Sequence, residues 1–214
     1  MSRSVSVKRP LVVIGFIVLI VILAGCCCVC LWLSAGMKSG PYPPPPFPIE
    51  DLLLDESLFP EGWYADEPFD PEERLLARQV AVGLHRGECP YYGLGALHEV
   101  YRFSEGAKSA TGAYPREIAY WFACEEVRGG GPWRIPTELP YQSPVADQFR
   151  FECCTYERTG SITCRAAGLY GRYIILFSVD LEPDYPVCMD FTDVERLLVT
   201  IDERMAFYGQ QETD

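Results

Sequence analysis

The chain has 214 residues and a formal net charge of −12, from 18 Lys and Arg against 30 Asp and Glu. Residues 1–40 carry four basic residues and no acid, so residues 41–214 have a net charge of −16. A surface this acidic repels phosphate groups, which excludes binding to nucleic acid and to anionic lipid headgroups. The absence of Asn also excludes N-glycosylation.

An apolar segment near the N-terminus predicts a membrane anchor. Residues 11–33 are 23 positions without a charge, about 34 Å as a helix and enough to cross a hydrocarbon core of about 30 Å. Three basic residues precede the segment: Arg3, Lys8 and Arg9. By the positive-inside rule, we expect a cytoplasmic basic tail at 1–10, a transmembrane helix at 11–33 in the cell membrane, and the C-terminal domain outside.

Part of this segment, Leu23-Ala24-Gly25-Cys26, resembles the lipobox of bacterial lipoprotein signal peptides. The basic and apolar regions before it also match that family, and the resemblance covers residues 1–26 only. It implies cleavage before Cys26 and lipidation of that cysteine. The apolar run continues past Cys26 to Leu33, which favours an uncleaved helix and leaves the lipid anchor as the alternative. Either anchor holds the domain at the outer face of the membrane.

Residues 34–48 predict a linker. Six of the eight residues in 41–48 are proline, which favours polyproline II at about 3.1 Å per residue. This semi-rigid spacer is expected to hold the following domain away from the membrane.

The domain begins at residue 49, and its first half predicts helices and two strands. A short helix is expected at 49–58, before Pro60 and Gly62. Alternating apolar residues then indicate strands at 79–84 and 96–103. Residues 104–124 favour a helix whose second half begins at Pro115, with five candidates for burial: Ala107, Ala110, Ile118, Trp121 and Phe122.

The second half predicts a hairpin, a central strand and a helix. Two β-like runs, 149–156 and 161–166, flank a turn at 157–160. Residues 172–179 are rich in β-branched and aromatic side chains, as in a central strand. The last helix is expected to have Thr192 as its N-cap and Glu195 in a capping box, with an apolar stripe of Val194, Leu198, Ile201 and Met205. The fold class is therefore α+β, with an antiparallel sheet of four to six strands and helices packed on one face, over residues 49–214.

Six cysteines of this domain are candidates for disulfides, because export places them in an oxidising compartment: Cys89, Cys124, Cys153, Cys154, Cys164 and Cys188. Cys154 and Cys164 lie symmetrically about Thr159, so the hairpin is expected to pair them. Cys153 would then need Cys124, Cys89 or Cys188. The spacings lack the paired C-x-x-C units of a zinc site.

No pattern in the chain identifies catalysis. His85 and His98 are the two histidines, and nothing in the sequence shows that they converge on a metal. Nucleotide-binding, serine-hydrolase and zinc-protease motifs are absent, and the acidic run 66–73 lacks an EF-hand pattern. We therefore assign no catalytic, metal or cofactor residues. Aromatic residues favour a core, or a groove for a sugar, lipid or peptide: Tyr91, Tyr92, Tyr114, Tyr120, Trp121, Phe122, Trp133 and Tyr141.

The architecture leads to a functional hypothesis of a membrane-anchored extracytoplasmic domain that binds a ligand or a partner protein. It contains an anchor, a stiff spacer and a domain without a catalytic pattern. The alternatives are a structural or assembly factor of an envelope complex and, less favoured, an exported hydrolase that uses carboxylates.

Overall fold

The computed structural model describes residues 47–70, 77–86, 95–123, 130–182 and 189–211. Two short 3-10 helices, η1 (Ile49–Leu52) and η2 (Glu56–Leu58), stand where the sequence predicted one helix. The strands in these ranges are β1 (Trp63–Ala65), β2 (Ala77–Arg86), β3 (Gly95–Phe103), β4 (Gln148–Thr155), β5 (Ile162–Tyr170) and β6 (Tyr173–Leu181). Helix α2 (Ala107–Trp121) lies between β3 and β4, and α3 (Phe191–Gln211) follows β6.

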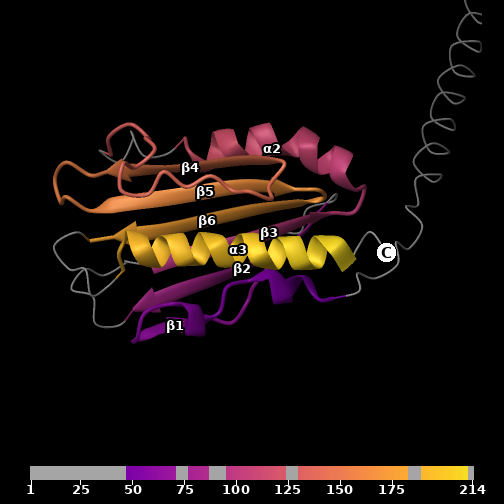
Figure 1. Cartoon of the computed structure of the whole chain (residues 1–214), viewed down its shortest axis with the longest axis horizontal. Coiled ribbons are helices and arrows are strands. Elements are labelled where there is room, and N and C mark those ends of the chain that lie inside the picture. The colour runs from indigo at the N-terminus through magenta and orange to yellow at the C-terminus, as the bar shows by residue number, and fades with distance from the viewer. Residues whose placement is uncertain (1–46, 71–76, 87–94, 124–129, 183–188, 212–214) are drawn as a thin grey trace, which may run out of the picture. The chain divides into compact units, whose positions relative to one another are not determined.

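All strand pairs are antiparallel, and the sheet order is β1-β2-β3-β6-β5-β4 (Figure 1). This confirms the predicted α+β class with an antiparallel sheet. The β4–β5 hairpin and the central position of β6 are also as predicted. Helix α2 and strands β4 and β5 come between β3 and β6 in the chain, yet β3 and β6 are neighbours in the sheet. The chain therefore adds β4 and β5 at the far side and returns to the middle of the sheet with β6.

The two helices pack on opposite faces of the sheet, so the prediction that helices cover one face is wrong. Alternate residues of a strand point to opposite faces. In β6, Ile175 and Phe177 join the core under α3, whereas Ile174 and Leu176 join a second core under α2. The sheet therefore has an α3 face and an α2 face, both apolar along most of β6.

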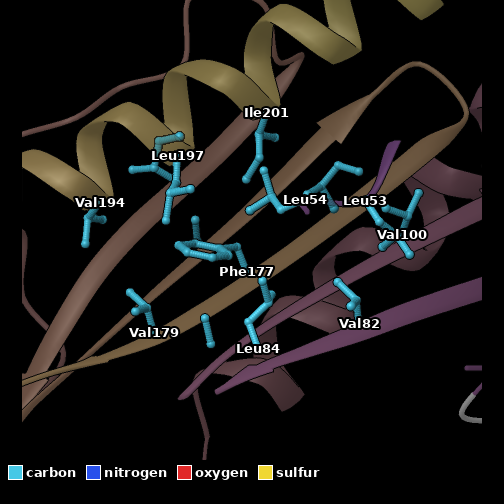
Figure 2. Close-up of a cluster of buried hydrophobic side chains, with 14 of the residues drawn as sticks. Leu53, Leu54, Val82, Leu84, Val100, Phe177, Val179, Val194, Leu197 and Ile201 are labelled. Atoms are coloured by element: carbon cyan, nitrogen blue, oxygen red, sulfur yellow. The ribbon is translucent and has the colours of Figure 1, made fainter. Parts of the chain in front are cut away.

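Helix α3 covers its face with the predicted stripe. Val194, Leu197 and Ile201 point toward Phe177 in Figure 2, and the four predicted stripe positions are all buried. The start of the helix differs from the prediction. Asp190 Oδ1 accepts hydrogen bonds from the amides of Thr192 and Asp193, at 2.8 and 3.0 Å. Asp190 is thus the N-cap in place of Thr192. Asp193 takes the predicted role of Glu195 in the capping box, since its carboxylate accepts a hydrogen bond from the Asp190 amide.

Helix α2 lies within the predicted helical segment 104–124, but it runs unbroken through Pro115 and has no second half that begins there. An internal proline costs a helix about 3 kcal/mol, because it has no N–H to donate and its ring clashes with a carbonyl of the preceding turn. Packing on both sides of Pro115 offsets this cost. Ala110 and Tyr114 are buried in the α2 core, and the Tyr114 hydroxyl donates to the Ala167 carbonyl oxygen at 2.8 Å. Of the other burial candidates, Phe122 is buried, Ile118 and Trp121 are half-buried and Ala107 is exposed.

Residues 47–59, here called the N-terminal strap, form part of the α3 core. Six strap side chains are buried there: Phe47, Ile49, Leu52, Leu53, Leu54 and Phe59. The Leu54 amide donates to His98 Nδ1 of β3 at 3.1 Å. Arg204 of α3 donates to the Leu53 carbonyl oxygen and, at 2.8 Å, to the Asp55 carboxylate. The strap is therefore fixed to both a strand and a helix.

A buried carboxylate joins α3 to β5 and to the segment before β4. Asp202 accepts hydrogen bonds from Tyr141, Ser143 and Tyr170 at 2.5, 2.7 and 2.7 Å. Burial, followed by the Asp202 hydrogen bond and charge, raises the pKa of both tyrosines above the ordinary range. The Tyr170 ring lies over Gly168, where an added Cβ would come within 2.4 Å of it. The missing side chain of Gly168 thus lets Tyr170 reach α3.

No helix within the described ranges is long and apolar enough to cross a bilayer. The predicted membrane segment 11–33, Cys26 and linker residues 34–46 lie outside the described residues.

We expect acid to destabilise the protein through His98, which is fully buried. Burial, and then the Arg204 charge, lowers its pKa from 6.5 to about 3. Neutral His98 thus contributes stability that is complete above pH 6.5 and is lost as the pH falls toward 3. In this window the unfolding equilibrium constant should rise about tenfold per pH unit, measured by denaturant titration.

Two substitutions identify the group responsible. His98→Asn keeps an acceptor for the Leu54 amide but does not titrate, so its pH slope should be smaller by that factor. Gly112→Ala, which removes no titrating group, should keep the wild-type slope. An unchanged slope in His98→Asn would contradict the assignment.

Candidate functional site

The α2 face becomes polar at the end of the sheet beyond the α2 core. Strand register aligns two rows of residues on this face, here called the polar rows. The first row is Gly83, Leu97, Ser178, Arg165 and Glu152. The second, one step further along the strands, consists of the pair His85 and Gly95 and of the aligned residues Asp180, Thr163 and Cys154. Eight of these ten residues are polar, charged or glycine, whereas the central strand is apolar in the other half of this face.

The change occurs along the central strand and on one face only. On the α2 face, β6 passes from Ile174 and Leu176 to Ser178 and Asp180. Its α3 face stays apolar to the end, through Val179 and Leu181. Strands buried on both faces are normally continuously apolar, so the polar rows mark a surface that helix packing does not explain.

Beside the polar rows, a half-exposed His85–Asp66 pair lies over two glycines of the sheet. Asp66 Oδ2 is 2.8 Å from His85 Nε2, and the Tyr64 ring is 5.8 Å from the imidazole. A Cβ at Gly83 would come within 2.8 Å of Asp66 Oδ2, and a Cβ at Gly95 within 3.4 Å of His85 Nδ1. Glycine at both positions therefore allows the imidazole to lie close to the sheet.

A buried polar cluster, here called the Gln79 cluster, adjoins the polar rows on β2 and β3. Gln79 Nε2 donates to Glu99 Oε2 at 3.1 Å and to the Tyr101 hydroxyl at 2.7 Å. The Tyr101 hydroxyl donates in turn to Glu99 Oε2 at 2.6 Å. Gln79 Oε1 is buried and has no hydrogen-bond partner in the part of the chain that the structure describes.

Arginines and aromatic rings occupy the β4–β5 side of the same face. Arg165 Cζ lies 5.2 Å from the Trp121 ring and 5.1 Å from the Trp133 ring, and its guanidinium donates to the Trp121 carbonyl oxygen. Arg150 Cζ lies 4.0 Å from the Phe122 ring. Arg150 also pairs with Glu152 at 2.6 Å. The α2 face is thus divided into an arginine–aromatic side and an acidic side with Glu99, Asp180 and Asp66.

The two histidines cannot form one metal site, because they lie on different faces of the sheet. His85 is on the α2 face, and His98 is on the α3 face beside Leu54. Among the described residues, no group of three or more His, Cys, Asp or Glu is arranged to hold a metal ion.

The disulfide of the hairpin joins Cys153 to Cys164, so the predicted Cys154–Cys164 pair is wrong. A turn of four residues, 157–160, has its centre between Arg158 and Thr159, and this places Cys153 opposite Cys164. Cys154 is opposite Thr163, on the other face, and its Sγ donates to the Gly131 carbonyl oxygen at 3.1 Å. The other candidates, Cys89, Cys124 and Cys188, lie outside the described residues.

Three of the aromatic candidates gather at the arginine–aromatic side: Trp121, Phe122 and Trp133. Tyr114 belongs to the α2 core, where burial raises its pKa, and Tyr141 contacts Phe149 on the α3 face. Tyr120 is exposed. Tyr91 and Tyr92 lie outside the described residues.

Sequence reasoning missed the polar positions of the site, Gln79, Glu99 and Ser178. The available signal was a polar residue on one face of an otherwise apolar strand, as with Gln79 among the residues of 77–84.

Comparisons with known proteins give one structural similarity. No protein-family model matches the chain, and no curated protein matches it. Among solved structures, the fold is similar to the extracellular domain of PknH from Mycobacterium tuberculosis, with a TM-score of 0.49 and 11% sequence identity. The similarity covers 73% of this chain and 94% of that chain. At this TM-score and identity, the likeness carries no argument about function.

We expect Gly83→Ala to displace the His85–Asp66 pair and to destabilise the protein by about 1–3 kcal/mol, because the new Cβ would overlap Asp66 Oδ2. Gly112→Ala is the matched control, since nothing lies within 4 Å of its Cβ position in α2. That change should stabilise the helix by about 0.5–1 kcal/mol. Denaturant unfolding measures both, and equal effects would contradict the close approach at Gly83.

Proposed function

We propose that this protein is a membrane-anchored domain that binds a ligand or a partner protein outside the cytoplasm through the polar rows of its α2 face. The observation that carries the proposal is the change of β6 from Ile174 and Leu176 to Ser178 and Asp180 on one face. Small and polar residues at the centre of a sheet provide hydrogen-bonding groups and space where a core would provide apolar contacts. Binding sites commonly combine such polar groups with neighbouring aromatic rings.

Export is supported by the N-terminal sequence and by the disulfide. The apolar run 11–33 follows basic residues, which favours an inside N-terminus. The Cys153–Cys164 bond is typical of a protein in an oxidising compartment. We propose an uncleaved helix as the anchor, with lipidation of Cys26 as the alternative.

The strap places the polar rows far from the point where the chain enters the domain. Phe47 stacks on Tyr208 near the C-terminal end of α3, with ring centroids 4.3 Å apart. Ser178 and Asp180 belong to the last four residues of β6. In Figure 1, the C-terminal end of β6 lies at the same end of the sheet as the start of α3. The nine residues of β6 span about 27 Å at about 3.3 Å per residue. The polar rows are therefore at the end of the domain opposite Phe47, the first described residue of the strap.

The topology can be tested by reversing the charge before the apolar run. Protease added to intact spheroplasts should digest the domain of the wild-type protein. The triple substitution of Arg3, Lys8 and Arg9 by Glu should protect a substantial fraction, because the positive-inside signal is removed. Intact mass of the N-terminus distinguishes the anchors, since a lipoprotein would begin at an acylated Cys26. Protection of the wild-type domain would contradict export.

Binding through the polar rows can be tested by filling them. We expect the full chain purified from membranes to carry extra mass under native conditions that disappears on denaturation. Ser178→Phe places a bulky ring in the polar rows and should remove the extra mass. Val199→Phe, at an exposed position on the outer side of α3, should retain it. Equal extra mass in both variants would place binding elsewhere, and its absence from the wild-type chain would favour an assembly role.

A further inference from the structure

We propose that the acidic side of the α2 face binds an ammonium group of the ligand, with Gln79 Oε1 as one of the accepting atoms. This inference rests on the proposed function and specifies the chemistry of its ligand. The acidic side consists of Gln79, Glu99, Asp180 and Asp66, on or beside β2, β3 and β6.

Gln79 is the residue that points to a ligand. Its side chain is only 4% exposed, and Oε1 has no partner among the described residues. A buried acceptor that lost its water without gaining a donor costs free energy. Leu at this position would avoid that cost while leaving the Tyr101–Glu99 hydrogen bond in place. An acceptor retained at such a cost is explained if a donor from outside the chain reaches it.

The orientation of the Gln79 amide follows from its neighbours. With Nε2 toward Glu99 and Tyr101, each of the three hydrogen bonds described above has one proton. The reverse orientation would place the amide oxygen 3.1 Å from the Glu99 carboxylate with no proton between them. The atom left without a partner is therefore an oxygen, which requires a donor.

The surroundings favour a donor that is small and positively charged. Ala81 and Gly83 are buried, and the His85–Asp66 pair covers Gly83 and Gly95, so a donor that reaches Gln79 must be small. Arg150 and Arg165, the basic residues of the aligned rows on this face, belong to β4 and β5 and contact aromatic rings there. The net charge of −16 in residues 41–214 also raises the local concentration of cations.

An ammonium group fits this environment better than the other common donors. It offers three N–H donors and no acceptor, and its hydrogen bonds to a carboxylate are stronger than those of a neutral hydroxyl. Amide oxygen and carboxylate oxygens only accept, so they complement it. An anionic group would meet the charge of Glu99 and would bring no proton for Gln79.

Side-chain amide NMR provides a direct test, because the chain contains five Gln and no Asn. The full chain, labelled with nitrogen-15 in detergent micelles, therefore has five side-chain amide pairs. Titration with propylammonium chloride at constant ionic strength should shift the Gln79 pair saturably. Propanol at the same concentrations should shift it much less.

Matched substitutions separate binding from stability. Gln79→Leu should weaken propylammonium binding about tenfold or more, measured by saturation-transfer NMR on the ligand, while the melting temperature stays the same or rises. Gln148→Leu is the control, since Gln148 aligns with Gln79 in the same row but lies exposed on β4. This control should bind as the wild type does.

Three results would overturn the inference: equal shifts with propanol, linear shifts of all five amide pairs, or unchanged affinity in Gln79→Leu. The first would identify a water or hydroxyl position, and the second nonspecific attraction to an acidic surface. If Gln79→Leu does not fold, the wild-type titration still decides. Failure here, combined with extra native mass that Ser178→Phe removes, would leave the proposed function intact with a ligand of different chemistry.

Discussion

A single sheet that must bury both of its faces determines most of this structure. The central strand β6 has one apolar set under α3 and another under α2, so its sequence is continuously apolar from Tyr173 to Phe177. The remaining elements follow from this requirement. Helix α2 covers the second face, although Pro115 interrupts its hydrogen bonding. The strap covers the part of the α3 face over β2 and β3 that α3 alone would leave exposed (Figure 2). Where β6 turns polar on one face, the apolar cover on that face also ends.

The strap makes Phe47, near the end of the predicted linker 34–48, part of the fold. Burial of a large apolar side chain contributes about 1.5–3 kcal/mol, and the strap buries six such side chains. Their sum is similar to the entire stability of a typical domain, about 5–15 kcal/mol. Detachment of the strap from His98 would therefore unfold the domain. Protonation of His98 is thus expected to lower the free energy of unfolding, and not to release the strap from an otherwise folded domain.

Much of the fold could be predicted from the sequence, and the errors have local physical causes. The periodic patterns located β2, β3, the β4–β5 hairpin, β6 and α3, because burial on a strand or helix leaves a repeat. Asp190 was missed as the N-cap because Thr192 and Glu195 also fit a capping box. The residue at which the helix begins decides between the two caps, and the sequence does not show it. The disulfide prediction was wrong because it placed the centre of the hairpin turn half a residue too late in the chain. This difference exchanges Cys153 for Cys154 opposite Cys164, and the two cysteines point to opposite faces of the sheet. The continuous apolar run 173–177 already indicated that helices cover both faces of the sheet. A strand with one face exposed to solvent would alternate apolar and polar residues. The Gln79 cluster was not predictable, because it depends on the register of β2 against β3.

Stability does not account for the polar rows. The pairs His85–Asp66, Arg150–Glu152 and Thr163–Asp180, at 2.8, 2.6 and 2.5 Å, satisfy one another's charges or hydrogen bonds. A partly exposed ion pair contributes about 0–1 kcal/mol, less than the 1.5–3 kcal/mol from burying a Leu or Ile at the same position. The sheet thus has less apolar burial at its central strand, and at Gln79 a buried acceptor has no partner among the described residues. Departures from the packing rule at a functional site are expected when the residues serve binding. Their concentration on one end of one face, with acids and arginines on opposite sides, is the arrangement on which the proposed binding site rests.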